Sequence, residues 1–470
     1  MSASRFDVLV LGGGTAGCVL AGRLSENPDC AVCLVEAGPD YGHFSNGAWP
    51  TKVVDALWRP FSHPWASDRA DRSAFRSRIL GGCSTQNGCV MLEGSRHDYD
   101  EWGDGWTYDE FLPYLRRARE TFRTRPPVEE MLSPWHRAFV EVGGAASILL
   151  SVNEVDGVRW NAAFAYIDPA RSRPNLTIVA NTLVERILFD RQRARGALTS
   201  AGALHADTVV VASGAYGTPG ILLRSGISPE TGLPAGERLR DHSGVGFRLE
   251  ATERLQSEMR TFAAKRPRFI EQVALRLQSS TSPDDHWDIF VFPWLESDLS
   301  ISAAVVAYKP RSTGAVRLSG PDAETPLAID NGFLSDPRDA EVLAEGIEMF
   351  RELLATAPIK CYATREKIPG AHIRSGLYAR AGVRSFLHPV GTCPIGSVVG
   401  PDGAVLGYDA LFVADASIMP TIPRANPHLT IAGIAERIAE LIQTRRPPSS
   451  ATGQLDEYDR RRGIAEEIKT

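Results

Sequence analysis

Three glycines near the N-terminus have the spacing of a turn that holds phosphate groups. Gly12, Gly14 and Gly17 lie in the run LGGGTAGC, and Glu36 follows about twenty residues later. The first glycine permits a tight turn, the second lets the backbone approach a pyrophosphate, and the third lets a helix pack closely on a strand. The carboxylate of Glu36 can accept hydrogen bonds from a ribose. The spacing therefore predicts a dinucleotide site, but it does not choose between FAD and NAD.

The residues around these glycines predict the βαβ unit that such a site requires. Residues 6–11 (FDVLVL) are a short apolar run that glycines stop, which is typical of a buried parallel strand. A helical pattern follows over 15–24, and a second strand is expected over 31–35. The helix begins at Thr15 and Ala16, so its free N–H groups and partial positive charge would face the phosphates.

Further strand and helix patterns follow along the chain. Strands are predicted over 176–189, 207–213, 302–319 and 409–413, and helices over 340–357 and 431–442. The run 207–213 ends in Ser213 and Gly214, which suggests a second loop at the cofactor. The alternation over 302–319, with PRSTG at a turn, favours an antiparallel sheet.

The composition narrows the class of protein. The 470 residues are 43% hydrophobic, enough for a core that divides into more than one domain. The 51 basic and 57 acidic residues form no long basic stripe, which argues against nucleic acid as a partner. The seven cysteines form no framework and Cys30 and Cys33 have no companion ligands, so we expect structural cysteines and no metal site. We find no signal peptide and no run of the roughly 18 apolar residues that a membrane span needs, and we expect a cytoplasmic location.

Four widely spaced segments together resemble one family of flavoenzymes. They are LGGGTAGCVLAGRL at 11–24, followed by VEAG; SRILGGCSTQNGCVMLEGSRHDYDEWG at 77–103; SGAYGTPGILLRSGI at 213–227; and a run over 386–442 that contains FLHPVGT and NPHLT. In this order they resemble the glucose–methanol–choline (GMC) oxidoreductases, from about residue 5 to residue 443. The resemblance implies an α/β fold, with a Rossmann-type FAD-binding domain and an interleaved substrate domain built on an antiparallel sheet.

The resemblance also implies how the chain alternates between the two domains. The FAD-binding domain would comprise 1–124, 176–246 and 386–445, and the substrate domain 125–175 and 247–385, with 446–470 as a polar C-terminal tail.

The family oxidises alcohols with a histidine paired to a second histidine or an asparagine, and His388 in FLHPVGT matches that histidine. Asn426 in NPHLT matches the partner position, but His428 stands two residues on and is the alternative partner. The chemistry suits these residue types. A base with a pKa near working pH must accept the hydroxyl proton as hydride leaves the carbinol carbon, and histidine meets that need. Asn426 can hydrogen-bond the substrate oxygen without competing for the proton.

The resemblance places further cofactor contacts in several loops. Besides Gly12, Gly14, Thr15, Ala16, Gly17 and Glu36, they are Ala37, Gly81, Gly82, Ser84, Asn87, Gly88, Val184, Ser213, Gly214, Asp415, Ala416, Pro427, His428 and Leu429.

Three features depart from the family pattern. Gln86 stands where some members have a histidine joined covalently to the flavin, so we expect FAD to be held non-covalently. Arg238 replaces a familiar asparagine. The chain is also shorter than most relatives, which predicts a trimmed substrate domain and a more open site.

The leading hypothesis is therefore FAD-dependent oxidation of a small-molecule alcohol, with hydride transfer to flavin N5 and His388 as the general base. The electron acceptor is open, so the enzyme is an oxidase or a dehydrogenase. Two alternatives remain: a non-redox FAD-containing lyase of the same family that cleaves a cyanohydrin, and a tailoring or carrier-linked dehydrogenase that acts on a larger specialised substrate.

Overall fold

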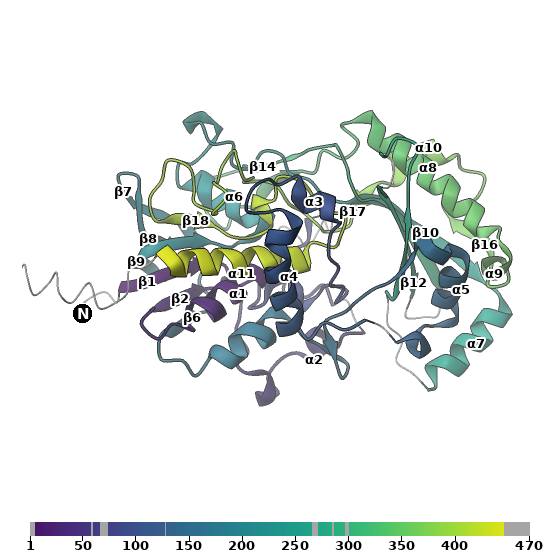
Figure 1. Ribbon diagram of the computed structural model, residues 1–470, viewed down its shortest axis with the longest axis horizontal. Helices are drawn as coiled ribbons and strands as arrows, with labels where there is room; N and C mark the ends of the chain where they lie inside the picture. The colour runs from purple at the N-terminus through teal and green to yellow at the C-terminus, as the bar shows by residue number, and fades with distance from the viewer. Residues whose placement is uncertain are drawn as a thin grey trace, which may run out of the picture.

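Each of the two lobes of the protein is built on one central β-sheet (Figure 1). The computed structural model describes residues 5–57, 60–65, 74–126, 128–265, 271–283, 286–296 and 300–445. The predicted tail, 446–470, lies outside the described residues. The fold is α/β, as the sequence predicted, and the two sheets differ in strand direction.

The sheet of the first lobe is mainly parallel where it meets the glycine-rich turn. Its strands, in spatial order, are β6 (Leu176–Val179), β2 (Val32–Val35), β1 (Arg5–Leu11), β9 (Gly202–Val211), β8 (Arg193–Thr199) and β7 (Val184–Asp190), with β18 (Leu411–Val413) also paired to β9. β1 pairs in parallel with β2 and β9, and β18 also runs parallel to β9. The strands predicted at 6–11, 31–35, 207–213 and 409–413 are confirmed, because these apolar runs are buried on both faces of the sheet.

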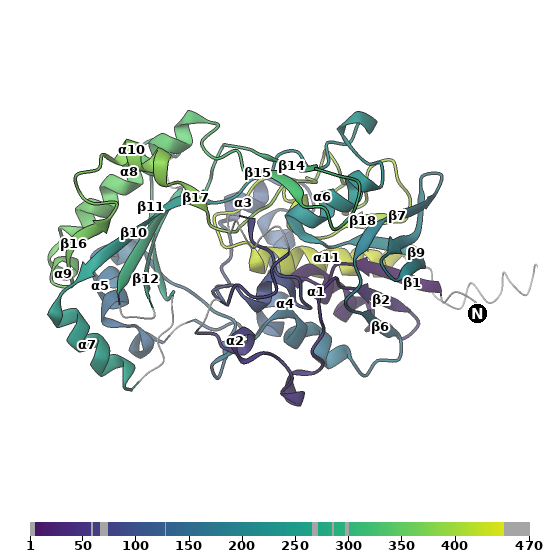
Figure 2. The same ribbon diagram turned by 180° about the vertical axis from the view of Figure 1, so that it is seen from behind.

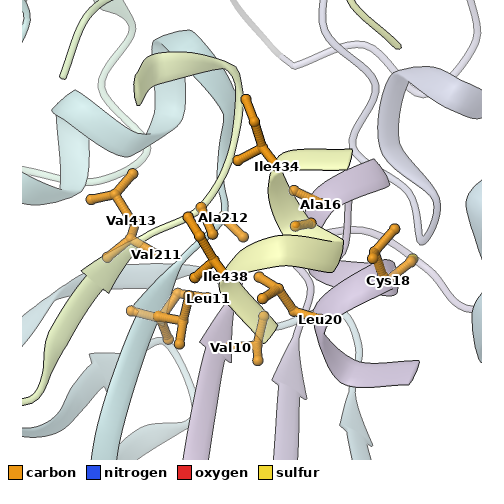
Figure 3. Close-up of a cluster of buried hydrophobic side chains, with 14 of the residues drawn as sticks. Val10, Leu11, Ala16, Cys18, Leu20, Val211, Ala212, Val413, Ile434 and Ile438 are labelled. Atoms are coloured by element: carbon orange, nitrogen blue, oxygen red, sulfur yellow. The ribbon is translucent and has the colours of Figure 1, made fainter. Parts of the chain in front are cut away.

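Three helices pack together against this sheet. They are α1 (Thr15–Leu24), α4 (Tyr108–Thr121) and α11 (His428–Arg445). Figure 3 shows Ile438 of α11 close to Val10 of β1 and Leu20 of α1, and all three residues are fully buried. The helix predicted over 431–442 is confirmed, but it begins three residues earlier, at His428. The first turn of α11 therefore follows Asn426 almost directly.

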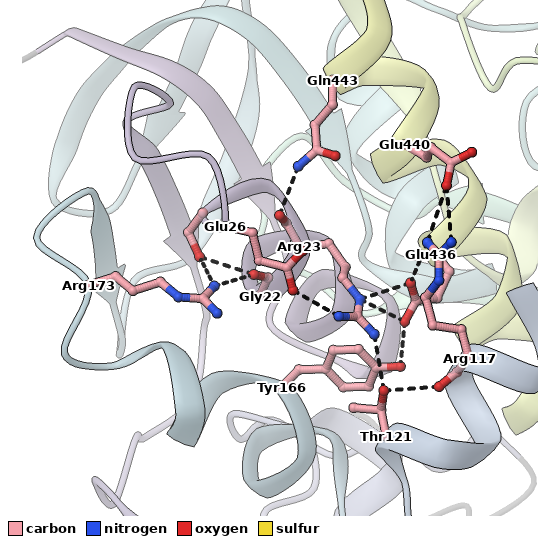
Figure 4. Close-up of polar contacts among 11 residues, drawn as sticks. Gly22, Arg23, Glu26, Arg117, Thr121, Tyr166, Arg173, Glu436, Glu440 and Gln443 are labelled. Carbon is pink, nitrogen blue, oxygen red and sulfur yellow. Dashed lines mark hydrogen bonds and ion pairs between the residues drawn. The ribbon is translucent and has the colours of Figure 1, made fainter.

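A buried polar network fixes α11 against α1. Glu436, 0% exposed, accepts hydrogen bonds from Arg23 Nε at 2.9 Å and from the Tyr166 hydroxyl at 2.8 Å (Figure 4). Arg23 also donates to the Thr121 hydroxyl at the end of α4. Because the carboxylate is paired and hydrogen-bonded, its burial is tolerated, and the network sets how the three helices lie relative to one another.

The sheet of the second lobe is antiparallel. Its strands, in spatial order, are β16 (Ala363–Ile368), β10 (Ser243–Ala251), β13 (Ile301–Ala307), β12 (Ile289–Leu295), β11 (Val273–Leu277) and β3 (Ser147–Leu149), with β17 (Arg384–Ser385) also paired to β10. Helices cover its outer face: α5 (Pro134–Gly143), α7 (Glu253–Ala263), α8 (Pro337–Leu354), α9 (Ala357–Lys360) and α10 (Ser375–Gly382) (Figures 1 and 2). The amphipathic helix predicted over 340–357 is α8, and it is confirmed. The inner face turns toward the first lobe.

The strand patterns predicted over 176–189 and 302–319 are each divided between two strands, and the antiparallel pairing and the PRSTG turn predicted for the second range are confirmed. Residues 176–189 form β6 and β7, which lie at opposite edges of the first sheet, because Asn181 between them has a left-handed φ of 52°. Residues 302–319 divide into β13 and a separate hairpin, in which β14 (Ala315–Leu318) pairs with β15 (Leu327–Asp330). The break comes at the PRSTG turn, where the backbone N–H groups of Arg311 and Ser312 donate to the Asp339 carboxylate instead of to a strand.

Shorter elements complete the structure. They are α2 (Thr51–Val54), α3 (Arg96–Asp100), α6 (Gly214–Arg224) and the hairpin of β4 (Glu154–Val155) and β5 (Val158–Arg159). Among the described residues, no helix combines the length and the apolar character that crossing a bilayer requires.

Candidate active site

A cavity opens where the parallel strands of the first sheet end. Gly12 follows β1, Glu36 follows β2, Ser213 follows β9 and Asp415 follows β18, and all four line the cavity. The carboxyl edge of a parallel sheet is the usual position of a cofactor in an α/β fold. The apolar strands thus bring residues from four distant parts of the chain to one place.

The glycine turn has the geometry that its sequence predicted. Gly12 adopts a φ of +105°, and a Cβ atom there would lie 2.8 Å from the carbonyl oxygen of Ala212. A Cβ on Gly17 would lie 1.8 Å from the carbonyl oxygen of Gly12. Gly82 approaches the turn from the next loop, since its own Cβ would meet the Gly14 Cα at 2.7 Å. Only glycine lets these backbones come so close.

Most of the predicted cofactor residues line this one cavity. They are Gly12, Gly14, Thr15, Ala16, Glu36, Ala37, Gly82, Val184, Ser213, Gly214, Asp415, Ala416 and Pro427. The structure thus brings together residues that were predicted from five separate segments.

The other predicted cofactor residues lie outside the lining of the cavity. They are Gly17, Gly81, Ser84, Asn87, Gly88, His428 and Leu429. Some of these support the lining loops. The backbone N–H of Gly81 donates to Gly13 at 2.7 Å, and the Ser84 hydroxyl donates to Gly81 at 2.6 Å while accepting from the Ala162 N–H. Leu429 is fully buried in the core.

Glu36 is held by the backbone on both sides. Its carboxylate accepts from the Gly13 N–H at 2.8 Å and from the Gly38 N–H at 2.7 Å, and the residue is 6% exposed. Burial raises the pKa of Glu36 to about 7, against these two hydrogen bonds. Further donors from a bound molecule, such as ribose hydroxyl groups, would stabilise its charged form.

The other predicted centre joins His388 to Asn426. The Nε2 atom of His388 lies 3.2 Å from the Asn426 Nδ2 atom, and both residues are partly exposed. The neighbours of His388 in the chain, Leu387 and Pro389, line the cofactor cavity. A turn precedes His388, in which Leu387 has a φ of 62° and donates its N–H to the Ser385 hydroxyl at 2.8 Å.

His428 lies elsewhere. Its Nδ1 atom accepts a hydrogen bond from the Asn87 amide at 3.1 Å, and its ring stacks edge-on against Phe122. The residue is buried, and desolvation lowers its pKa to about 4, so the ring is neutral at physiological pH. The structure therefore brings Asn426, rather than His428, to the imidazole of His388.

A buried ion cluster fixes the segment that carries Asn426. Asp98, fully buried, accepts from Arg424 Nη1 at 2.6 Å, from the Arg424 N–H at 2.8 Å and from Lys309 Nζ at 3.0 Å. Lys309 also donates to the carbonyl of Ile422 at 3.2 Å. Burial alone would raise the pKa of Asp98, but Lys309 and Arg424 together hold it below its ordinary value.

Comparison with known proteins identifies the family. Two protein-family models, both described as GMC oxidoreductase, match residues 6–244 and 310–435 of this chain. This chain belongs to the GMC oxidoreductase family. It is an FAD-dependent oxidoreductase, as its resemblance to that family implied.

Relatives of the family span the whole chain. An oxygen-dependent choline dehydrogenase of Burkholderia vietnamiensis is 30% identical and covers 96% of this chain and 96% of its own length. Among solved structures, pyridoxine 4-oxidase from Mesorbium loti is 24% identical with a TM-score of 0.80, over 94% of this chain and all (100%) of its own. A formate oxidase variant of Aspergillus oryzae RIB40 is 21% identical with a TM-score of 0.82, over 95% and 99% of the two chains. The two solved structures share the fold.

The residues of the cavity fit the FAD that this family uses. Within the described residues no side chain caps α1 at Gly14, so the first-turn N–H groups of Thr15 and Ala16 are available to phosphate oxygens at the cavity wall. The buried carboxylate of Glu36 lies on the same wall with capacity for further donors. Gln86 is not part of the cavity lining. Its amide oxygen accepts from the Ser62 N–H, and its amide nitrogen donates to the Ser62 carbonyl.

Sequence reasoning missed several residues of the GMC site. The cavity is also lined by residues 323–327 of the β14–β15 hairpin and by Tyr216 and Arg224 of α6. At His388, the missed residues are Asp241 and His242. The segment PAGERLRDHS at 234–243 carries a further short likeness to the family and could have signalled them. A second short likeness, YKPRSTGAVRLSG at 308–320, reaches β14 of the hairpin but ends before residues 323–327.

Proposed function

We propose that this GMC oxidoreductase oxidises an alcohol by removing hydride from the carbinol carbon while His388 takes the hydroxyl proton. The observation that carries the proposal is the juxtaposition of His388 Nε2 and the Asn426 amide, 3.2 Å apart, between two residues that line the FAD cavity. FAD, when bound, supplies the hydride acceptor, its N5 atom. A hydroxyl group that binds at Nε2 can give its proton to the imidazole, since histidine titrates near neutral pH.

Asn426 has a supporting role in this proposal. Its amide N–H groups can donate to the alcohol oxygen as negative charge develops there, and a neutral amide does not compete for the proton. The first turn of α11 begins two residues later, and its partial positive charge favours negative charge nearby. Pro427, just before α11, and Ile431, in its first turn, line the cavity, so this field acts on the cofactor as well.

The inner face of the second sheet supports a substrate with a neutral, apolar body. Tyr308, whose hydroxyl lies 3.5 Å from the Asn426 amide oxygen, stacks on Phe290 at 4.2 Å between ring centroids. Phe292 and Trp287 continue this aromatic cluster, in which Tyr308 and Phe290 are 0% exposed. Charged groups of both signs lie beside it, because the Arg276 guanidinium is 4.9 Å from the centre of the Trp287 ring and Glu271 acts on Tyr308. From the aromatic character of this wall we infer an arylalkyl or other apolar alcohol.

The parts of the chain that bind cofactor and substrate correspond to the two sheets. We propose that residues 1–124, 176–246 and 386–445 hold FAD, and that 125–175 and 247–385 supply most substrate contacts. Gln86, engaged with Ser62, supports FAD held without a covalent bond, because a carboxamide is not a nucleophile toward the flavin.

Anaerobic flavin reduction tests the proposal. The holoenzyme is mixed with a panel of arylalkyl alcohols, and with choline for comparison, and bleaching of the flavin absorbance is followed. His388→Ala should slow bleaching by about 10²–10⁴-fold, the usual contribution of a general base, while FAD remains bound. Asn426→Ala should slow it less, because the proton acceptor remains. His205→Ala, at an exposed position of β9, is the matched control and should bleach at the wild-type rate.

Three results would contradict parts of the proposal. Equal rates of flavin reduction in the wild type and in His388→Ala would show that His388 is not the general base. A larger loss in His428→Asn than in Asn426→Ala would identify the partner as His428. Cyanohydrin cleavage by an enzyme whose flavin stays oxidised would identify a lyase instead.

A further inference from the structure

A second imidazole stands directly behind His388. His242 precedes β10 and is 0% exposed. Its Nδ1 atom lies 2.9 Å from the Nδ1 atom of His388, and the two rings meet edge to face at 87°. Its Nε2 atom lies 3.1 Å from the carbonyl oxygen of Pro423. The ring of Tyr308 stacks on it at 4.0 Å between centroids and fixes its plane.

These contacts determine which nitrogen of each ring carries a proton. A carbonyl oxygen only accepts hydrogen bonds, so the Nε2 atom of His242 must be protonated to bond Pro423. In the neutral ring the Nδ1 atom of His242 is then a bare acceptor. The facing Nδ1 atom of His388 must therefore carry the hydrogen of the bond between the rings. Neutral His388 is left with its lone pair on Nε2, where the structure places the donating amide of Asn426.

The surroundings keep His242 neutral. Burial lowers the pKa of His242 far below its ordinary value, and the neighbouring His388 and Lys309 lower it further. The hydrogen bond to the carbonyl of Pro423 raises this pKa, but its effect is smaller than that of burial. The carboxylate of Asp241, the residue before His242, accepts hydrogen bonds from the Ser385 hydroxyl and from the His388 backbone N–H at 2.8 Å. It therefore holds the backbone of His388 rather than either ring.

We propose that His242 is a positioning residue that fixes the tautomer of His388, so that Nε2 is the atom that accepts the substrate proton. Without it, His388 could carry its proton on Nε2 instead, and that form is unable to act as a base. The inference rests on the proposed function of His388 in alcohol oxidation. His242 also remains an acceptor after His388 becomes charged, so it stabilises the imidazolium that the reaction forms.

Two substitutions separate this role from packing. His242→Phe keeps a ring against Tyr308 but removes the acceptor. His242→Gln keeps both functions, because its amide oxygen can accept from His388 Nδ1–H and its amide nitrogen can donate to Pro423. His136→Phe is the matched control. His136 is also a fully buried histidine whose Nε2 atom faces a proline carbonyl, that of Pro293 at 3.2 Å, but it lies on α5.

The first measurement is anaerobic flavin reduction by the holoenzyme as a function of alcohol concentration and pH. In His242→Phe the limiting rate should fall by about 10–10³-fold, since a wrong tautomer disables a histidine base. The alcohol concentration for half-saturation should change little. The acidic limb of the pH profile should move to lower pH, because the protonated His388 loses an acceptor and forms less readily. His242→Gln should restore most of the rate, and His136→Phe should keep the wild-type pH profile whatever its stability.

The second measurement reads the tautomer directly. In holoenzyme labelled with ¹⁵N-histidine, the His388 resonances, identified by their loss in His388→Asn, should show a protonated Nδ1 and an unprotonated Nε2 at a pH where the ring is neutral. This spectrum of the wild type shows which nitrogen of His388 is protonated, even if His242→Phe does not fold. A protonated Nε2, an unchanged rate in His242→Phe, or an equal loss in His242→Gln and His242→Phe would overturn the proposal. If His388→Ala leaves the rate unchanged, it is the proposed function that fails, and the tautomer is still read from the spectrum.

Discussion

At the scale of single residues, the site places a buried carboxyl group beside its base. Asp241 is 3% exposed, and burial raises its pKa to about 7, against hydrogen bonds from Ser385 and from the backbone N–H groups of His388 and His242. Its ionisation therefore changes within the pH range in which the enzyme would be assayed. The effect on stability has a definite sign. A folded-state pKa above the ordinary value of 3.8 adds stability below pH 3.8, and this stability is lost as the pH rises through 7.

Asp241→Asn tests that sign. The amide oxygen can still accept from the His388 N–H and the amide nitrogen can donate to Ser385, so the shape of the site is kept. The free energy of unfolding of the wild type should fall relative to that of the variant between pH 4 and 7, by up to about 1.4 kcal/mol per pH unit. Urea unfolding with saturating FAD at several pH values measures the difference. A difference that does not change with pH would mean that Asp241 titrates alike in the folded and unfolded protein.

Motifs predicted some of the residues in the site but not their contacts. Gly12 and Gly17 were predictable because backbone geometry restricts those positions to one residue type. His388 and Asn426 were identified only because their segments resemble the GMC family. The contact between His242 and His388 joins residues 146 apart in the chain and depends on the orientation of two rings. Spacing along the sequence contains no information about such an orientation.

At the scale of elements, apolar runs predicted the parallel strands β1, β2, β9 and β18, and helical patterns predicted α1, α8 and α11. Which sheet each strand joins is decided by tertiary contacts. The turn predicted at PRSTG within 302–319 is confirmed, but β13 and β14 belong to different sheets, and Asp339 at the start of α8 accepts hydrogen bonds from the backbone between them. Local patterns could not show that a carboxylate from another element would compete for those N–H groups.

The ion cluster of Asp98 should be the main link between α3 and the segment before α11. Asp98→Asn leaves the guanidinium of Arg424, a residue 6% exposed, without its charged partner and should lower the free energy of unfolding by about 3–5 kcal/mol. Because the displaced segment carries Asn426, flavin reduction should also slow. Urea unfolding and anaerobic bleaching measure the two effects.

Asp109→Asn is the control for this element. Asp109 pairs with Arg96 at the exposed N-terminal turn of α4, where its side chain is 73% exposed. Water screens that pair, so the variant should be indistinguishable from the wild type in stability and rate. Equal effects of the two substitutions would show that burial of Asp98 does not matter.

At the scale of the whole molecule, the cofactor cavity joins segments that lie far apart in the chain. Its lining runs from Gly12 after β1 to Ile431 in α11, and it includes residues 323–327, which lie between strands of the second half of the chain. A ligand that touches all of these segments stabilises their shared arrangement. The folded state of the first lobe should therefore depend on the concentration of FAD.

Removal of FAD tests this dependence. Acid precipitation should release all flavin as free FAD, because the carboxamide of Gln86, which is hydrogen-bonded to Ser62, is not a nucleophile toward the flavin. Gentle removal of FAD should give an apoprotein with a lower melting temperature, and added FAD should restore that temperature. At a hundredfold excess over the Kd, FAD should add about 2.7 kcal/mol to the free energy of unfolding. In Glu36→Ala the same concentration series should require more FAD, since a hydrogen bond to a charged group contributes about 1.5–3 kcal/mol. Flavin retained in the acid pellet would contradict non-covalent binding, and a melting temperature that does not change with FAD would contradict the assignment of this cavity to FAD.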